Sequence, residues 1–324
     1  MPTAKPGAPP PPPFWGPVTA NYDWCGAAVR DLSFDAPRLA SRPDHLMDAF
    51  RPCAPPPSLR CEENYAWTPY VAEMFNTLSS VPTLTVGVYF LLVAAKHRYG
   101  FRFRLAGWML ALVGVGSVAF HGTLTRVGQI LDEVPMLYSS SIFLWIGGSL
   151  LYPANAEGDR RSAVLGFALL AYCAIVTAVY FAGGFEAFFV AYAITVVAVA
   201  VVSLKASAKS DVRSTTRPYV LWAFGIYVGG FLALWVPEQV FCGNRVVVHR
   251  HSLLQELPVP LHAFFHVTSS VGPLAWLTFA AFEAMHRAKR APKIAWGRRW
   301  LLWGARGPEV VPKKPPAPKR AKAP

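Results

Sequence analysis

Charged residues are scarce in this chain, which excludes an ordinary soluble enzyme and a wholly disordered protein. They make up 15% of the 324 residues, against about a quarter in a typical soluble domain, while hydrophobic residues reach 53%. The five cysteines form no Cys-x-x-Cys pair, so a structural zinc module is not expected. The Pro-rich first 13 residues lack the apolar stretch of a cleavable signal peptide. The composition predicts an integral membrane protein.

Long apolar runs follow a polar N-terminal region. Each is near the ~20 residues that cross a bilayer as a helix. They lie at about residues 70–95, 105–121, 131–151, 163–183, 186–204, 218–236 and 259–282. We therefore expect an all-α fold, a bundle of seven transmembrane helices. The expected regions are an N-terminal part (1–69), a membrane domain (70–285) and a basic tail (286–324).

Lysine and arginine are unevenly distributed among the loops, and this predicts the orientation. They gather at residues 96–104, 160–161 and 205–217, after the first, third and fifth runs, and in the tail from residue 287. Because cytosolic loops are enriched in these residues, we expect a lumenal N-terminus and a cytosolic C-terminus. The basic tail suits anionic lipid headgroups. Nucleic acid is not an expected partner, since the aromatic residues lie in apolar runs rather than among the charges.

Few polar side chains interrupt the apolar runs, and those that do are functional candidates because polar groups are costly in a bilayer. They lie at the starts of odd-numbered runs and at the end of the second run. These are Glu73, Asn76, Ser117, His121, Asp132, Glu133, His262 and His266. Odd-numbered runs would enter the membrane from the lumen and even-numbered ones return to it. All eight residues are therefore expected at the lumenal end of the bundle.

Three of these residues suggest a metal site. His262 and His266 are four residues apart and share one helix face, and His121 could supply a third ligand. Three histidines leave one tetrahedral position open, as in catalytic zinc sites, where a bound water is activated for hydrolysis. Ser117, one turn before His121, could polarise a carbonyl, and Asp132 could transfer a proton to a leaving amine. The alternative is that these histidines are interfacial and bind no metal.

Three sequence blocks resemble the alkaline ceramidase family. They are Glu62-Glu63-Asn64-Tyr65 with the following Tyr70 to Ser79, the segment from Gly114 to Tyr138, and His262 to His266. The resemblance implies a zinc-dependent intramembrane amidase of the endoplasmic reticulum or Golgi. It would hydrolyse ceramides, of the dihydro- or phytoceramide type, to a sphingoid base and a fatty acid. The resemblance assigns zinc to His121, His262 and His266, and catalysis to Ser117 and Asp132.

The family also has an N-terminal calcium site, in a motif of the form Asp-Trp-Cys-Glu-x-Asn-Tyr, from which this sequence departs. The motif stops at Cys25 and resumes at Glu62, so residues 26–61 look like an insertion. We expect either a tolerated loop or an unspliced segment of the gene model. If the loop closes on itself, calcium falls on oxygen atoms of Asp23, Trp24, Glu62, Asn64 and Glu73. Otherwise these residues only cap the first helix.

Other functions stay open at this point. The adiponectin and progestin receptor group looks similar in its seven spans and polar layout, but its usual orientation is opposite. A related hydrolase that remodels the lipid anchors of proteins is a second alternative, and a lipid-binding scaffold without chemistry is a third. In the last lumenal loop, Glu238 stands where the family pattern has an Asp, and Cys242 could pair with Cys25 or Cys61.

Overall fold

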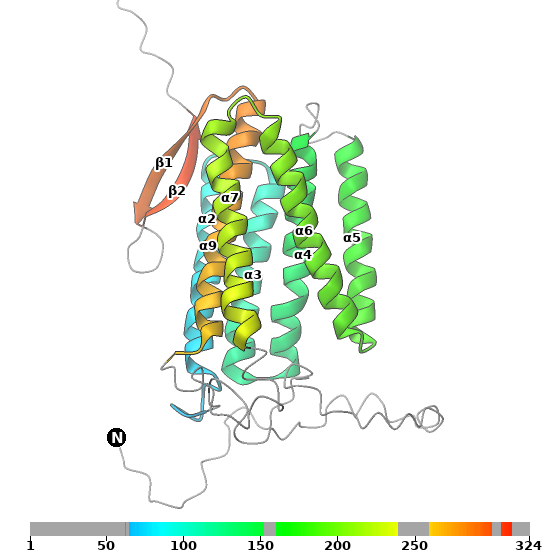
Figure 1. Cartoon of the computed structure of the whole chain (residues 1–324), viewed down its shortest axis with the longest axis vertical. Helices are drawn as coiled ribbons and strands as arrows, with labels where there is room; N and C mark the ends of the chain where they lie inside the picture. The colour runs from blue at the N-terminus through cyan, green and yellow to red at the C-terminus, as the bar shows by residue number, and fades with distance from the viewer. Residues whose placement is uncertain (1–61, 63–64, 152–159, 239–258, 300–305, 313–324) are drawn as a thin grey trace, which may run out of the picture. The chain divides into compact units, whose positions relative to one another are not determined.

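The computed structural model describes residues 62, 65–151, 160–238, 259–299 and 306–312. These residues form long helices and one pair of strands (Figure 1). The helices are α2 (Met74–Lys96), α3 (Phe101–Thr123), α4 (Arg126–Leu151), α5 (Arg160–Phe181), α6 (Phe185–Ala208), α7 (Arg213–Gly230) and α9 (Leu261–Arg287). A π-helical turn, Phe231–Trp235, directly follows α7. Every predicted apolar run is therefore helical.

Six stretches of the described chain are long and apolar enough to cross a membrane. They are α2 to α6, and α7 with its extension to Glu238. The protein is thus a mostly helical, multi-pass membrane protein. The seventh run also folds as a helix, α9, but this helix lies outside the six because polar residues occur along its length. A seventh span and the orientation of the termini stay predictions.

Glycines let α3 approach its neighbours closely near the predicted polar residues. A Cβ added at Gly116 would overlap the carbonyl oxygen of Leu131 in α4, and one at Gly114 would overlap the backbone nitrogen of Leu84 in α2. Any side chain there would force the helices apart, which is why small residues are typical of membrane helix interfaces. The close approach at Gly116 holds Ser117, the next residue, beside the start of α4.

The chain divides into two compact units. The first comprises residues 1–87, 109–136 and 225–271, and the second comprises residues 88–108, 137–224 and 272–324. All the described candidate residues, from Glu62 to His266, belong to the first unit. In the second unit, α5 and α6 contact each other and are joined by a short turn in which Gly183 has a φ of 93°.

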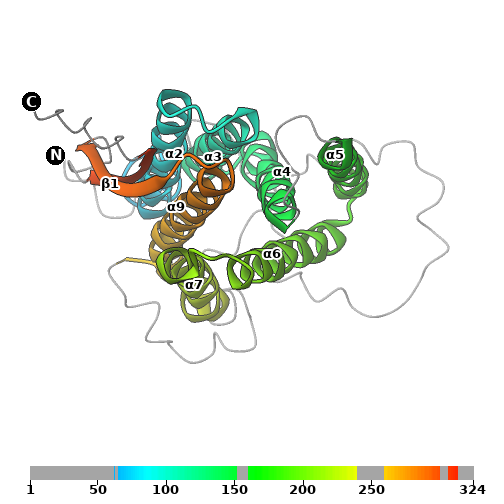
Figure 2. The same ribbon diagram turned by 90° about the horizontal axis from the view of Figure 1, so that it is seen from above.

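The C-terminal region contains a β-hairpin that the sequence did not predict. Strands β1 (Pro292–Arg299) and β2 (Arg306–Pro312) pair antiparallel in the second unit, and Figures 1 and 2 show the hairpin beside the C-terminal end of α2, which belongs to the same unit. The Tyr99 hydroxyl donates to the Val310 carbonyl (2.8 Å) and accepts from the Val310 N–H (2.9 Å). Part of the predicted basic tail is therefore folded against the segment that follows α2.

A buried carboxylate completes this attachment. Glu309 is 5% exposed, and its Oε2 atom lies 2.8 Å from Lys96 Nζ and 2.8 Å from His97 Nε2. Burial alone would raise the pKa of Glu309. The hydrogen bonds from Lys96 and His97 outweigh that effect and hold the pKa below its ordinary value. The hairpin is thus held by charge as well as by hydrogen bonds to the backbone.

Candidate metal centre and active site

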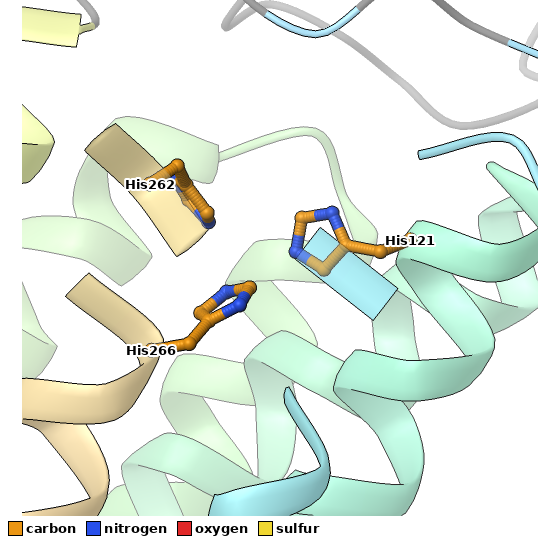
Figure 3. A group of neighbouring side chains, drawn as sticks. All are labelled: His121, His262 and His266. Carbon is orange, nitrogen blue, oxygen red and sulfur yellow. The ribbon is translucent and has the colours of Figure 1, made fainter. Parts of the chain in front are cut away.

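Three histidine side chains meet in the first unit. His121 comes from the end of α3, and His262 and His266 come from the first two turns of α9 (Figure 3). A ligand nitrogen of each ring lies within 4.8 Å of those of the other two, and the ring centroids are 4.5 to 5.2 Å apart. His121 and His266 are buried, and His262 is partly buried. This histidine cluster is compact enough for one metal ion to contact all three rings.

The position of His121 follows from how the chain enters α2. The last carbonyl groups of a helix have no partner within that helix. At the end of α3, the Gly122 carbonyl accepts the Ala72 N–H and the His121 carbonyl accepts the Glu73 N–H, both at 2.9 Å. Ala72 is buried there with Phe120 and Leu124. The entry to α2 is thereby tied to the end of α3, which places the Glu73 side chain next to His121.

The carboxylate of Glu73 holds the ring of His121. Its Oε2 atom lies 2.6 Å from His121 Nδ1 and accepts from the Asn76 amide at 3.2 Å. Metal-binding histidines usually donate their second ring N–H to a carboxylate or carbonyl oxygen, which fixes the ring and the tautomer. With Nδ1 engaged, Nε2 of His121 is left as the ligand atom. The donor set and its support therefore fit a zinc ion bound by three imidazoles.

Ser117 and Asp132 lie next to the histidine cluster in sequence and in space. Ser117 is 5% exposed and one helical turn before His121. Its side chain hydrogen-bonds with that of Asp132, in the second turn of α4, and its Oγ lies 2.9 Å from Ser80 Oγ in α2. Asp132 and His121 are close enough to interact electrostatically. A hydroxyl, a carboxylate and three imidazoles thus share one buried region, which suits hydrolysis of a polarised carbonyl compound.

The match to a protein-family model identifies the family. The model described as Ceramidase matches residues 60–310, which include all the helices of the described residues and nearly all of the two strands. The chain belongs to the ceramidase family. This match confirms the resemblance to the alkaline ceramidase family that the sequence blocks indicated.

Individual relatives of this ceramidase agree with that assignment. The alkaline ceramidase YPC1 of Saccharomyces cerevisiae is 30% identical over 227 residues, which cover 65% of this chain and 71% of the yeast protein. Alkaline ceramidase 3 of Mus musculus is 25% identical over 283 residues, which cover 87% of this chain and 90% of the mouse protein. The alkaline ceramidase of Arabidopsis thaliana is 27% identical over 239 residues, which cover 72% of this chain and 86% of the plant protein.

The calcium ligands predicted for this ceramidase are only partly within the described residues. Asp23, Trp24 and Asn64 lie outside them, as does the 26–61 insertion. Glu62 accepts the backbone N–H groups of Phe75 (2.6 Å) and Asn76 (3.1 Å), so it caps the start of α2. Burial, helped by the nearby Glu73 carboxylate, raises the pKa of Glu62 despite these hydrogen bonds. The capping role matches one of the two predicted alternatives, and calcium binding stays a prediction.

Several residues support the site in ways that the sequence did not indicate, although Asn76 was among its candidates and Glu238 was singled out. Glu238 Oε2 accepts the His262 N–H at 2.6 Å and so caps the start of α9. Ser79 and Ser80 contact His266, and Asn76 contacts both Glu73 and His266. The family pattern pointed to position 238 without giving it a role. Nothing in the sequence distinguishes Ser79 and Ser80 from other membrane-helix serines, because their importance depends on which helix lies opposite.

Proposed function

We propose that this ceramidase hydrolyses the amide bond of ceramides and releases a sphingoid base and a free fatty acid. The observation that carries the proposal is the buried histidine cluster with Ser117 and Asp132 beside it. Family membership supports it, and so do the names of the relatives, which are alkaline ceramidases. Dihydro- and phytoceramides are the proposed substrates, in line with the resemblance to fungal enzymes of the family.

The proposed cofactor is zinc, held by His121, His262 and His266. A zinc ion bound there would supply Lewis acidity and a water molecule of lowered pKa. Glu73 keeps Nε2 of His121 available as a ligand, and Glu238 fixes the backbone of His262 through the cap of α9. The histidines therefore need little rearrangement when they bind the ion, which lowers the cost of assembling the site.

Ser117 and Asp132 are the proposed catalytic side chains. The Ser117 hydroxyl donates to the amide oxygen as negative charge develops on it. Asp132 takes a proton from the attacking water and passes it to the amide nitrogen. A carbon–oxygen bond to water forms and the carbon–nitrogen bond breaks, so the acyl group leaves as the fatty acid and the nitrogen as the free amine. One carboxylate thus serves both proton transfers.

The proposed location is the membrane of the endoplasmic reticulum or Golgi, with α9 as the seventh span. The site residues come from the start of α2, the end of α3, and the starts of α4 and α9. Because consecutive spans alternate in direction, these ends would lie on one side, which the distribution of lysine and arginine makes the lumenal side. The hydrocarbon chains of a ceramide would then enter from the bilayer, with the amide at the lumenal level.

Fatty-acid release by the detergent-purified protein tests the proposal. Ceramide, dihydroceramide and phytoceramide are supplied in parallel, and bound zinc is measured in the same samples. We expect His262→Ala to lose both zinc and activity. The matched control is His286→Ala, on the same helix but paired with exposed Asp211, which should keep both. Wild-type protein that holds zinc yet hydrolyses none of the three lipids would contradict the proposal.

A further inference from the structure

Two adjacent serines of α2 face the histidine cluster, and both hydroxyls also lie within hydrogen-bond distance of the Asn76 carbonyl. Ser79 Oγ and Ser80 Oγ both donate to the backbone carbonyl of Asn76, at 3.1 and 2.6 Å. A serine hydroxyl has a single proton to donate and two lone pairs that accept. With their protons directed to Asn76, the oxygens of this hydroxyl pair, Ser79 and Ser80, are left as acceptors.

The ring of His266 meets three such acceptors. Its Nδ1 atom lies 2.9 Å from Ser79 Oγ, 3.2 Å from Ser80 Oγ and 3.2 Å from the Asn76 carbonyl oxygen. His266 is 7% exposed, so water does not readily replace these partners. A nitrogen surrounded by acceptors is satisfied only when it carries the ring proton. The other nitrogen, Nε2, then keeps its lone pair and is the atom that can bind a metal.

Ser80 also contacts the Ser117 hydroxyl. The two Oγ atoms are 2.9 Å apart, and both side chains are at most 5% exposed. Since the Ser80 proton goes to Asn76, Ser117 is the donor of this hydrogen bond. The Asp132 carboxylate is close enough to compete for the same Ser117 proton. Ser80 therefore keeps that proton from settling on the carboxylate, so that it can be passed to an amide oxygen once substrate is bound.

We infer that the hydroxyl pair positions the active site, with Ser79 setting the tautomer of His266 and Ser80 holding the Ser117 hydroxyl in place. The two serines are positioning residues, because neither is required to touch the substrate. The inference rests on the proposed function for the role of Ser117. The role of Ser79 concerns metal binding alone, so it can be tested without measuring ceramide hydrolysis.

Two alanine variants separate the two roles. Loss of a partner of a metal-binding histidine typically costs about 10- to 100-fold in metal affinity or activity. We expect Ser79→Ala to lower zinc affinity by about tenfold or more, measured by competition with a chelator, and to shift the absorption bands of the cobalt-substituted protein. We expect Ser80→Ala to keep most of its zinc affinity and lose about tenfold in kcat with little change in KM. Ser80→Thr retains the hydroxyl and should restore kcat.

Thr83→Ala is the matched control. Thr83 lies one turn beyond Ser80 on α2, and its Oγ1 lies 2.7 Å from Ser270 Oγ of α9. The variant removes a buried hydroxyl contact between the same two helices without touching His266 or Ser117. We expect wild-type zinc affinity, cobalt spectrum and kcat.

The inference is overturned if Ser79→Ala binds zinc like Thr83→Ala, or if Ser80→Ala turns over like Thr83→Ala, while wild type hydrolyses ceramide. In that case the proposed function stands and only the role of the serines fails. If the wild-type protein binds neither zinc nor cobalt, both the proposed function and the role of the serines are wrong. Zinc binding that weakens in Ser79→Ala without any ceramide hydrolysis supports the role of Ser79, and overturns the proposed function together with the role of Ser80.

Discussion

At the scale of single residues, Glu73 is the side chain for which two roles compete. Its Oε2 atom lies 2.6 Å from His121 Nδ1, and the resemblance to the family's calcium motif predicts a second role for it as a calcium ligand. Glu73→Gln removes the negative charge while keeping an oxygen acceptor. If the main role is to support His121, zinc affinity should fall by about 10- to 100-fold. Chelator competition measures this, and Glu186→Gln, at an exposed position of α6, is the control.

The calcium alternative predicts a different result for the same variant. If Glu73 served calcium alone, Glu73→Gln would retain wild-type zinc affinity and lose any stimulation of activity by added calcium. Activity is therefore measured with calcium and after its removal by a calcium-selective chelator. Glu62→Gln separates the cases further, because Glu62 caps α2 without contacting a histidine in the described structure.

Asp132 is the residue whose loss should abolish turnover without loss of metal. It interacts with Ser117 and His121 but is not one of the three clustered ligands. Asp132→Asn preserves size and removes the proton acceptor. General acid–base groups contribute about 10²- to 10⁴-fold, so we expect fatty-acid release to fall within that range at normal zinc content. Release close to the wild-type rate would remove Asp132 from the mechanism.

At the scale of elements, the histidine pair of α9 could be predicted because it depends on helix periodicity alone. The helices likewise followed from runs of apolar residues. The caps could not be predicted in this way. Glu62 and Glu238 bind backbone N–H groups 13 and 24 residues away, and the sequence does not show which helix start each carboxylate reaches. The β-hairpin was missed because its attachment depends on Lys96, His97 and Tyr99, about 200 residues earlier.

The hairpin attachment should weaken in acid. Because the pKa of Glu309 is lowered in the folded protein, its contribution to stability is complete above the ordinary glutamate value, about 4.3. That contribution is lost as the pH falls through the lowered value. Hydrogen exchange of the 306–312 segment, corrected for the intrinsic rate, should therefore speed up below about pH 4.

Two variants separate the charge of Glu309 from the hydrogen bonds of the hairpin. Glu309→Gln should exchange faster at neutral pH and lose the extra acceleration in acid. Tyr99→Phe removes both hydrogen bonds to Val310 but no charge, so it should exchange faster at neutral pH and retain the acid response. An acid response that persists unchanged in Glu309→Gln would assign it to another group.

At the scale of the whole chain, the proposed site needs one particular arrangement in the membrane. The candidate residues start α2, end α3 and start α4 and α9, and they share a side if each intervening helix crosses the bilayer. Between α4 and α9 lie α5, α6 and α7, and each of them meets the length and hydropathy of a span. In that arrangement, the distribution of lysine and arginine predicts that the starts of α2, α4 and α9 lie on the lumenal side.

Protease protection of tagged protein in sealed microsomes tests this arrangement. If α9 is a seventh span, a C-terminal tag is cytosolic and is digested without detergent, whereas an N-terminal tag is protected. The receptor-like alternative has a cytosolic N-terminus and predicts the opposite pattern. If α9 failed to cross, both tags would lie in the lumen, and the basic tail would face a leaflet poor in anionic lipid. The inverted pattern would place Lys96 and His97 in the lumen, whereas failure of α9 alone would leave them in the cytosol and separate them from Glu309, their partner, in the lumen.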